Sequence, residues 1–238
     1  MKLLLTILTV FLLISFQSAF SQIDQDHTFY IGASFGKSYA LSDFKDTDIT
    51  NPDAGFADDG TKLDIYGGFF LDDNVTLTGT FRSQSFDTQI GSLVDDFNTD
   101  NPGSNFSGNT EDWQVYSLLI GAAYKIPVYK KFALYPRVGI GPMVVNNPGI
   151  TISSTDAAMT QNFSRSSESG FGFGYELGIG LKTDLGKHFT LMPTFTFSGG
   201  YTTIRDVESI TDSVTVTSNF DAKIQSFNLG MSIAYRFY

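Results

Sequence analysis

The sequence predicts an all-β protein: an eight-stranded antiparallel up-and-down transmembrane β-barrel, closed between its first and eighth strands. Two observations lead to this prediction. Apolar and polar residues alternate with a period of two in eight stretches, which is typical of strands whose two faces have different surroundings. Short polar turns and long polar loops also alternate between these stretches. In an up-and-down sheet, this places all long loops at one end and all tight turns at the other.

Residues 1–21 precede the first strand and have the pattern of a secretory signal peptide. Lys2 is followed by an apolar run over 3–16 and by the small-residue cleavage pattern AFS at 19–21. The run is shorter than the roughly 20 residues that a membrane-spanning helix needs, so a retained anchor is the less favoured alternative. Residues 22–238 are then predicted to form one outer-membrane barrel domain.

The composition excludes several classes of function. The chain has 25 Asp and Glu residues against 15 Lys and Arg residues, which argues against a nucleic-acid partner, because phosphates need clustered cations. It has no cysteine. A disulfide framework, a thiolate metal site and a cysteine nucleophile are therefore excluded.

The elements are predicted in the following order along the chain. The eight strands cover 27–37, 61–71, 75–86, 113–126, 132–143, 170–183, 188–201 and 223–237. Tight turns lie at 72–74, 127–131 and 184–187, and long loops lie at 38–60, 87–112, 144–169 and 202–222. No segment of useful length shows a convincing helical period. The four loops contain 18 of the 25 acidic residues but only the cations Lys45, Arg165 and Arg205, so one end of the molecule is strongly negative.

Each predicted strand has one apolar face, and its other face carries small, hydroxyl-bearing or charged residues. The sixth strand, GFGFGYELGIGLKT, shows this most clearly, because its bulky residues alternate with glycines and Glu176. The apolar faces include Phe29 and Phe35; Leu63, Ile65 and Phe69; Val75, Leu77 and Phe81; Tyr116, Leu118, Ile120 and Tyr124; Phe132, Leu134, Val138 and Ile140; Phe171, Phe173, Tyr175, Leu177 and Ile179; Phe189, Leu191, Phe195 and Phe197; and Phe227, Leu229, Met231, Ile233, Tyr235 and Phe237.

Three arguments place the apolar faces against lipid rather than inside a soluble barrel. The interior of an eight-stranded barrel is too narrow for the bulky residues of every strand, but it suits small residues with a few long charged ones. Strands of about 10 residues or slightly more suit a tilted crossing of the hydrocarbon layer. Aromatic residues stand near both ends of the apolar faces, as in the girdles of membrane barrels.

Closure of the barrel has a physical cause, because an open sheet edge in lipid leaves unpaired backbone groups that cost several kcal/mol each. Eight antiparallel strands can close first to last. Pro136 and Pro193 each remove one backbone donor from a strand, so local bulges are expected at both positions.

The inward faces place several charged side chains in the predicted lumen, where they must pair or be hydrated. Glu176 is the expected hub, with Arg82, Arg137 or Arg236 as its partners. One interpretation is a gated conduit that prefers anions, and the favoured one is a structural polar plug. The full predicted lumen network is Lys62, Asp64, Arg82, Lys125, Arg137, Glu176, Lys182 and Arg236.

Catalysis and metal binding have little support in the sequence, and no cofactor is predicted. A serine site assisted by histidine would need an imidazole near the long loops, but His27 and His188 both fall at the tight-turn end. The acidic pairs at 46 and 48, 58 and 59, and 95 and 96 could offer oxygen ligands to Ca²⁺. Solvated acidic loops are the favoured interpretation, because no EF-hand pattern is present.

These features together resemble the eight-stranded outer-membrane β-barrel proteins of Gram-negative bacteria, the OmpA-like and OmpX-like group. The resemblance covers the whole mature chain and includes the final stretch FNLGMSIAYRFY. It implies an outer-membrane location, contact with outer-membrane lipid, and recognition of the last strand by the barrel-assembly machinery. Members carry such a strand with a terminal aromatic residue, whereas here the outward set ends at Phe237 and Tyr238 adds one residue.

The expected function is a non-enzymatic surface or structural role, in envelope integrity or adhesion, by a monomer whose acidic loops face outward and could bind an extracellular ligand. The turns and both termini would face the periplasm. The main alternative is a small transport barrel for small or apolar solutes. A secreted lipocalin-like binder and a lipid-modifying barrel enzyme are less favoured.

Overall fold

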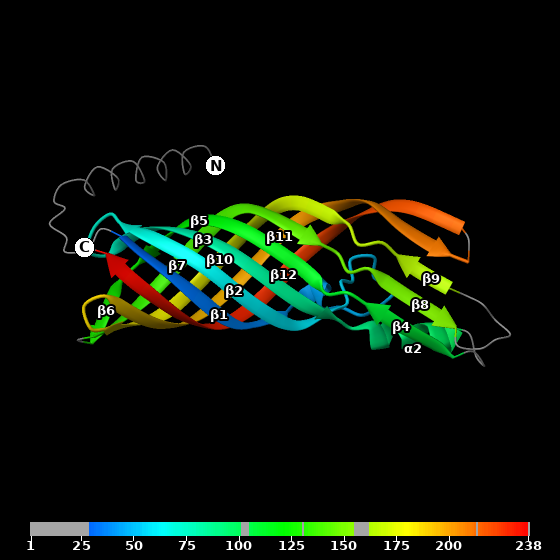
Figure 1. Cartoon of the computed structure of the whole chain (residues 1–238), viewed down its shortest axis with the longest axis horizontal. Helices are drawn as coiled ribbons and strands as arrows, with labels where there is room; N and C mark the ends of the chain where they lie inside the picture. Colours follow the sequence, from blue (N-terminus) through cyan, green and yellow to red (C-terminus); the bar gives the residue numbers. More distant parts are fainter. Residues whose placement is uncertain (1–28, 101–104, 130, 155–161, 213, 238) are drawn as a thin grey trace, which may run out of the picture.

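The computed structural model describes residues 29–100, 105–129, 131–154, 162–212 and 214–237 (Figure 1). The predicted signal peptide at 1–21, the start of the first predicted strand at 27 and 28, and Tyr238 lie outside the described residues. Among the described residues, no helix is both long and apolar enough to cross a membrane.

The described chain consists mostly of β-strands. Its strands are β1 (Phe29–Ala40), β2 (Ala57–Phe70), β3 (Val75–Thr88), β4 (Phe106–Thr110), β5 (Trp113–Tyr124), β6 (Ile126–Tyr129), β7 (Phe132–Asn146), β8 (Ile150–Ser154), β9 (Asn162–Arg165), β10 (Ser169–Leu185), β11 (Phe189–Thr211) and β12 (Val214–Phe237). One 3-10 helix, η1 (Ser42–Phe44), and one α-helix, α2 (Ile90–Asp100), lie in the connections.

Eight of the described strands form a closed antiparallel ring in the order β1, β2, β3, β5, β7, β10, β11, β12. β12 then pairs with β1 from Phe237 opposite Phe29 to Ser226 opposite Ala40, so the ring closes over the whole length of β1. The predicted barrel and its closure between the first and last strands are confirmed. β1 begins and β12 ends at the same end of the barrel, on the left in Figure 1.

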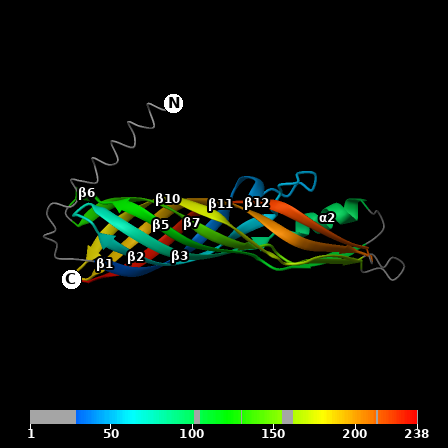
Figure 2. The ribbon, with the colours of Figure 1, turned by 90° about the horizontal axis from the view of Figure 1, so that it is seen from above.

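The opposite end, which we call the loop end, carries a sheet that the sequence did not predict. β11 and β12 continue beyond the ring as a hairpin, and β9, β8 and β4 add to β11 in that order. The extension projects from the barrel with α2 beside β4, as seen from two directions in Figures 1 and 2. The prediction of 202–222 as a loop is therefore wrong, and the loops predicted at 87–112 and 144–169 contain regular elements.

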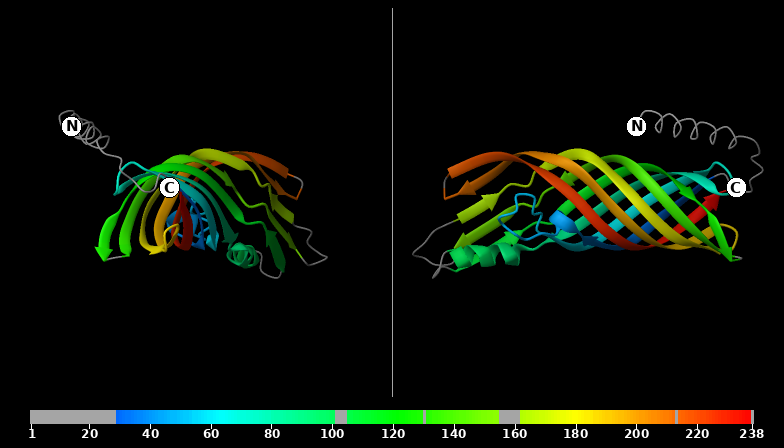
Figure 3. Two further views of the ribbon diagram at one scale, coloured as in Figure 1. Left: turned by 60° about the vertical axis from the view of Figure 1, so that its left-hand side comes forward. Right: turned by 180° about the vertical axis from the view of Figure 1, so that it is seen from behind.

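Helix α2 also corrects the expectation that the chain has no useful helical period. Ile90, Leu93, Val94 and Phe97 are spaced as one face of a helix, and they pack against Phe106 and the buried isoleucines of β8. Figure 3 shows α2 as a short helix at the far end of the extension. The helix therefore buries its apolar face against β4 and β8 of the extension.

The bulges expected at Pro136 and Pro193 are absent. Pro136 lies opposite Ile179 and Pro193 opposite Met231, and neither register shifts at the proline; the one shift between β11 and β12 lies between Ile204 and Val207. The pairing of β10 with β11 omits the pairs nearest Pro193 but resumes in the same register. The missing donors therefore interrupt the hydrogen bonding locally, and the register is held by the pairs on either side.

The apolar faces point outward along all eight ring strands. Ile140 and Phe173 are each 70% exposed, and the outward set forms a belt around the barrel. On the inward face, glycines stand where long side chains of neighbouring strands come close. A Cβ atom on Gly178 would lie 2.6 Å from the Thr196 side chain and 3.3 Å from Arg137, and one on Gly180 would lie 2.5 Å from Met192. The glycines of β10 thus leave space for long side chains from neighbouring strands.

Candidate functional site: the barrel interior and the cavity at its loop end

The barrel interior is filled by layers of side chains, and an ionic layer lies among them. Asp64 of β2 and Glu176 of β10 are both buried. Asp64 accepts two hydrogen bonds from Arg82 of β3, at 2.7 and 3.0 Å, and pairs with Lys62 at 3.1 Å. Arg137 of β7 lies 2.7 Å from Glu176 and 4.0 Å from Asp64, while Arg82 also pairs with Glu176.

Two carboxylates in this layer, Asp64 and Glu176, each pair with more than one cation. The sequence predicted only Glu176 in that role. Asp64 faces three cations and Glu176 faces two. β2 and β3 are neighbours, and the register places Asp64 directly opposite Arg82. Glu176 comes from β10 and reaches Arg82 across the lumen. The layer therefore links opposite walls of the barrel through charge-assisted hydrogen bonds, which are the strong class of hydrogen bond.

The remaining predicted lumen residues lie apart from this layer. They are at the end of the barrel opposite the loop end, which carries the tight turns and which we call the turn end. Arg236 pairs with Asp184 at 3.4 Å and donates to the carbonyl oxygens of Gly186 and Lys187, so it is not a partner of Glu176. Lys182 pairs with Asp184 at 3.9 Å. Lys125 is half-buried and forms no ion pair among the described residues.

A layer of aromatic residues lies between the ionic layer and the turn end. Tyr30 packs against Tyr66 with ring centroids 6.0 Å apart and against Phe70 at 5.5 Å. The hydroxyl of Tyr135 donates to Thr76 at 2.7 Å, and Tyr66 is hydrogen-bonded to Ser232. The cavities bordered by Tyr30, Tyr66 and Tyr135 measure about 10 and 20 Å³, which is at most about one water molecule each.

A layer of amide and hydroxyl groups lies on the other side of the ionic layer, and sequence reasoning missed it. The Gln84 amide donates to Ser38 at 3.1 Å, to Ser226 at 3.2 Å and to Asn228 at 2.9 Å. Asn228 in turn donates to Ser198 at 2.9 Å. The sequence does show these polar residues on the inward faces of the strands. Uncharged residues in such positions do not by themselves indicate that they form one hydrogen-bond network.

An apolar plug closes the interior at the loop end. Phe44 of η1 packs edge-on against Phe86 at 5.1 Å and Trp113 at 5.4 Å, and the Trp113 indole donates to the carbonyl oxygen of Gly55 at 2.9 Å. The segment between β1 and β2, which includes η1, therefore folds over the ring as a lid. The plug consists of Ala40, Phe44, Ala57, Phe86, Trp113, Val115, Met143, Val145, Ile204, Val207, Ala222 and Ile224.

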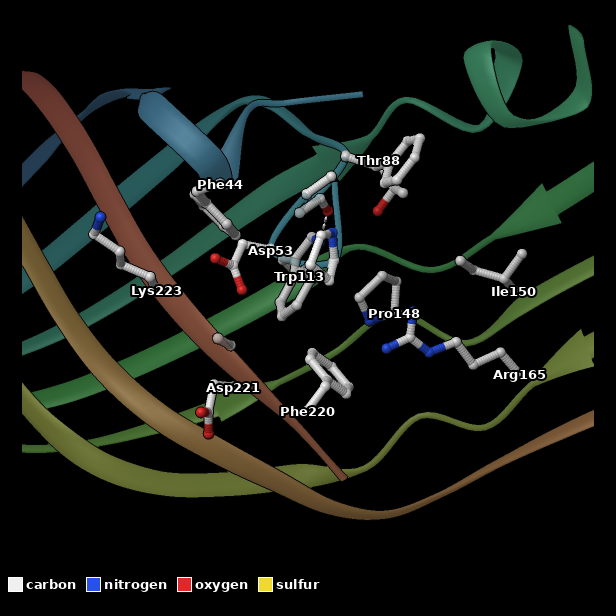
Figure 4. A pocket seen from close by; sticks show the side chains of 15 residues that line it. Phe44, Asp53, Thr88, Trp113, Pro148, Ile150, Arg165, Phe220, Asp221 and Lys223 are labelled. Carbon is white, nitrogen blue, oxygen red and sulfur yellow. Dashed lines mark hydrogen bonds between the residues drawn. The ribbon is translucent and has the colours of Figure 1, made fainter. Parts of the chain in front are cut away.

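A cavity of about 110 Å³ lies above this plug and is shown in Figure 4. Its walls come from the lid, from β3, from β5, from the β7–β8 connection and the start of β8, from β9 and from β12. Phe44, Trp113 and Phe220 supply aromatic surface, while Arg165 and Asp221 supply charge. The Asp221 carboxylate accepts from Thr203 at 2.7 Å, and its hydrogen bonds with Tyr201 and Thr203 lower its pKa from the ordinary range.

Asp46 and Asp48, two of the acidic residues considered as calcium ligands, hold the lid in shape. Asp46 accepts from the backbone of Asp48 at 3.1 Å and from the Asn51 amide at 2.7 Å, and these bonds lower the pKa of Asp46. Asp48 accepts from the backbone and the hydroxyl of Thr50. Within the described ranges, no group of three or more acidic or histidine side chains is arranged to hold a metal ion.

His188, one of the two histidines, lies at the turn end, where its ring stacks on Tyr235 with centroids 5.3 Å apart. His27 lies outside the described residues. The described histidine is therefore remote from the cavity, because the whole barrel separates the turn end from the loop end (Figure 1).

Comparison with known proteins identifies the type of barrel. A family model described as "Outer membrane protein beta-barrel domain" matches residues 6–237. A major outer membrane protein from Thermus thermophilus is 13% identical, with 90% of this chain and 100% of that chain covered and a TM-score of 0.53. Ail, the attachment invasion locus protein of Yersinia pestis, is 16% identical, with 90% and 100% covered and a TM-score of 0.44.

The outer membrane protein OprG from Pseudomonas aeruginosa is 12% identical, with 89% of this chain and 96% of that chain covered and a TM-score of 0.42. No curated protein sequence matches the chain. At 13% identity, the match to the Thermus protein shows the fold alone.

Proposed function

Because the chain belongs to the outer membrane protein beta-barrel domain family, and so lies in the outer membrane, we propose that it is a closed, non-enzymatic barrel with a structural and surface-interaction role. The observation that carries this proposal is the filled interior. The apolar plug, the amide layer, the ionic layer and the aromatic layer follow one another from the loop end to the turn end. A solute or ion would have to displace all four layers to pass.

The acidic loop end supports the surface role. The segments predicted as loops hold 18 of the 25 acidic residues, and much of this region is built into the lid and the extension. A folded acidic surface keeps its charges in a fixed arrangement, which favours selective contact with cationic groups over general repulsion. We propose that this end faces outward, and that the turns and the processed N-terminus face the periplasm.

Conductance of the purified protein in planar lipid bilayers tests the closed barrel. We expect no stable openings, because the two cavities described around the tyrosines hold at most about one water molecule each. A variant in which Phe44, Phe86 and Trp113 are all replaced with alanine is the matched control, since it empties the plug but leaves the three layers beneath it. It should also stay closed. Stable openings of the unmodified protein would overturn the proposal in favour of a small transport barrel.

A further inference from the structure

Of the two cations in the wall of the loop-end cavity, Arg165 and Lys223, Arg165 is the one that forms no ion pair among the described residues. Arg165 lies at the end of β9, between Ile150 of β8 and Ser209 of β11, so backbone pairing on both sides fixes its position. Its guanidinium carbon stands 4.4 Å from the centre of the Phe220 ring. Figure 4 shows the guanidinium directed into the cavity, toward Pro148 and Phe220.

The guanidinium forms no ion pair with any carboxylate of the described residues, although much of the side chain is shielded from solvent. This burial lowers the pKa of Arg165, and no neighbouring acidic group offsets the effect. The Phe220 ring lies against the planar group, and the guanidinium N–H groups make no hydrogen bond to another described residue. An arginine edge of this kind matches the two oxygens of a carboxylate.

The other charged residues of the cavity wall either have a partner in the structure or lie at the mouth of the cavity. Asp221 is hydrogen-bonded to Thr203, and Lys223 pairs with Asp43 at 3.2 Å. Asp53 is exposed at the mouth. The inner part of the cavity therefore combines one available cation with aromatic and aliphatic surface from Phe44, Trp113 and Ile150.

We propose that this cavity binds a small organic monocarboxylate, with its carboxylate on the edge of Arg165 and its hydrocarbon part against the aromatic wall. The volume sets the size of the ligand. A cavity of about 150 Å³ holds benzene, so one of about 110 Å³ takes a chain of the length of propionate or butyrate. This inference goes beyond the proposed surface role, and it does not depend on whether the lumen conducts.

Butyrate is a suitable probe, and butyramide is its neutral control of the same shape. The protein in lipid nanodiscs would be titrated with each at constant ionic strength and followed by saturation transfer to the ligand protons. Trp113 provides a second readout, because it lines the cavity and is the only tryptophan in the sequence. We expect saturable millimolar binding of butyrate with a change in tryptophan emission, and no saturable binding of butyramide.

Arg165→Gln should weaken butyrate binding about tenfold or more, because a charge-assisted pair is replaced by a neutral one. Arg205→Gln is the matched control, since it removes the same charge from an exposed position on β11 outside the cavity wall, and it should bind like the unmodified protein. Asp53→Asn should strengthen binding, because it removes a negative charge from the mouth.

Far-UV circular dichroism and heat-dependent gel mobility show whether each variant is folded. If Arg165→Gln does not fold, Phe220→Leu tests the same cavity, because it removes the ring beneath the guanidinium and should also weaken binding. Equal binding of butyrate and butyramide, equal weakening by Arg165→Gln and Arg205→Gln, or no binding by the unmodified protein would each overturn the proposal.

Discussion

At the scale of single residues, Asp64 is the group on which the interior depends most. It is fully buried and faces Lys62, Arg82 and Arg137, so its removal leaves three buried cations with Glu176 as their acidic partner. Breaking a buried pair of this kind is costly because the remaining charge stays desolvated. The exposed acid Asp184, which pairs with Lys182 and Arg236, provides a contrast within the same barrel.

Asp64→Asn should therefore lower the free energy of unfolding by about 3–5 kcal/mol. Asp184→Asn should lower it by about 1 kcal/mol or less, because solvent screens the pairs that Asp184 forms. Urea unfolding in lipid vesicles, followed by gel mobility, measures both. Glu176→Gln should fall between the two, since Glu176 faces two cations rather than three. An unchanged midpoint for Asp64→Asn would contradict the description of the ionic layer as built on two carboxylates.

Two glycines of the barrel wall should respond in opposite ways to alanine. A Cβ atom on Gly178 would crowd Thr196 and Arg137, whereas one on Gly79 would meet no atom within 4 Å. Gly178→Ala should destabilise the barrel by about 1–3 kcal/mol through overpacking. Gly79→Ala should be neutral or stabilising by up to about 1 kcal/mol, because a glycine in a strand loses more backbone entropy on folding. The same unfolding experiment distinguishes them, and similar effects would contradict the crowded-lumen explanation.

At the scale of elements, the segment between β1 and β2 acts as a lid, and Phe44 is the aromatic side chain that it contributes to the apolar plug. Phe44 is buried against Phe86 and Trp113, while Ile49 in the same segment is 53% exposed. The hydrogen bonds around Asp46 and Asp48 shape the segment but do not attach it to the barrel. The lid is attached by the buried Phe44, by the hydrogen bond from Trp113 to Gly55 and by the exposed pair of Lys223 with Asp43, and of these Phe44 supplies the buried apolar surface.

Phe44→Ala should release the lid from the plug and expose Trp113 to solvent. The expected result is a red shift of tryptophan emission and stronger quenching by acrylamide. The loss of buried aromatic surface corresponds to about 3–5 kcal/mol, which a short lid cannot replace. Ile49→Ala is the matched control and should leave both signals unchanged. Unchanged quenching in Phe44→Ala would show that the lid is held by other contacts.

The eight ring strands could be predicted from the sequence, and the extension could not, for a physical reason. Lipid outside and a narrow polar lumen inside impose a strict alternation, as in Phe171, Phe173 and Leu177 of β10. Beyond the belt both faces of β11 and β12 meet water or protein, and the sequence around Val214 and Val216 reads as a polar loop. Helix α2 did carry a readable signal in the spacing of its apolar residues.

The members of the ionic layer could be named from the sequence, but their pairing could not. Alternation alone assigns Asp64, Arg82, Arg137 and Glu176 to the lumen. Asp64 meets Arg82, and Arg137 meets Glu176, across neighbouring strands, but the links from Arg82 to Glu176 and from Arg137 to Asp64 join strands that are not neighbours and are a property of the closed barrel. For the same reason Arg236, expected near Glu176, lies with Asp184 at the other end. The loop-end cavity was hidden because it joins residues from six separate segments.

At the scale of the whole molecule, the exposed apolar residues fall into a belt and an extension with different surroundings. Ile140 is 70% exposed in the belt, and Val214 is 65% exposed at the tip of the β11–β12 hairpin. Exposure alone does not separate these two positions, but the position along the barrel axis does. The belt is expected to face hydrocarbon and the hairpin tip to face water.

Ile140→Arg should therefore destabilise the protein in lipid vesicles by about 2–4 kcal/mol, the cost of a cation near the middle of the bilayer. Val214→Arg should change the free energy of unfolding by less than about 0.5 kcal/mol, as is usual for surface substitutions. Measuring both variants in the same vesicles removes differences in lipid. Equal costs would mean that the membrane extends over the hairpin or does not cover the belt.

The pairing of β1 with β12 also has a consequence for the order of events during folding. Every residue of β1 has a partner in the last strand, between 186 (Ala40 with Ser226) and 208 (Phe29 with Phe237) positions away in the chain. One edge of β1 therefore stays open until synthesis has reached the end of β12, and contacts of such long range form slowly. Insertion into the membrane must wait for the finished chain, so the nascent protein needs protection against aggregation while it travels to its destination.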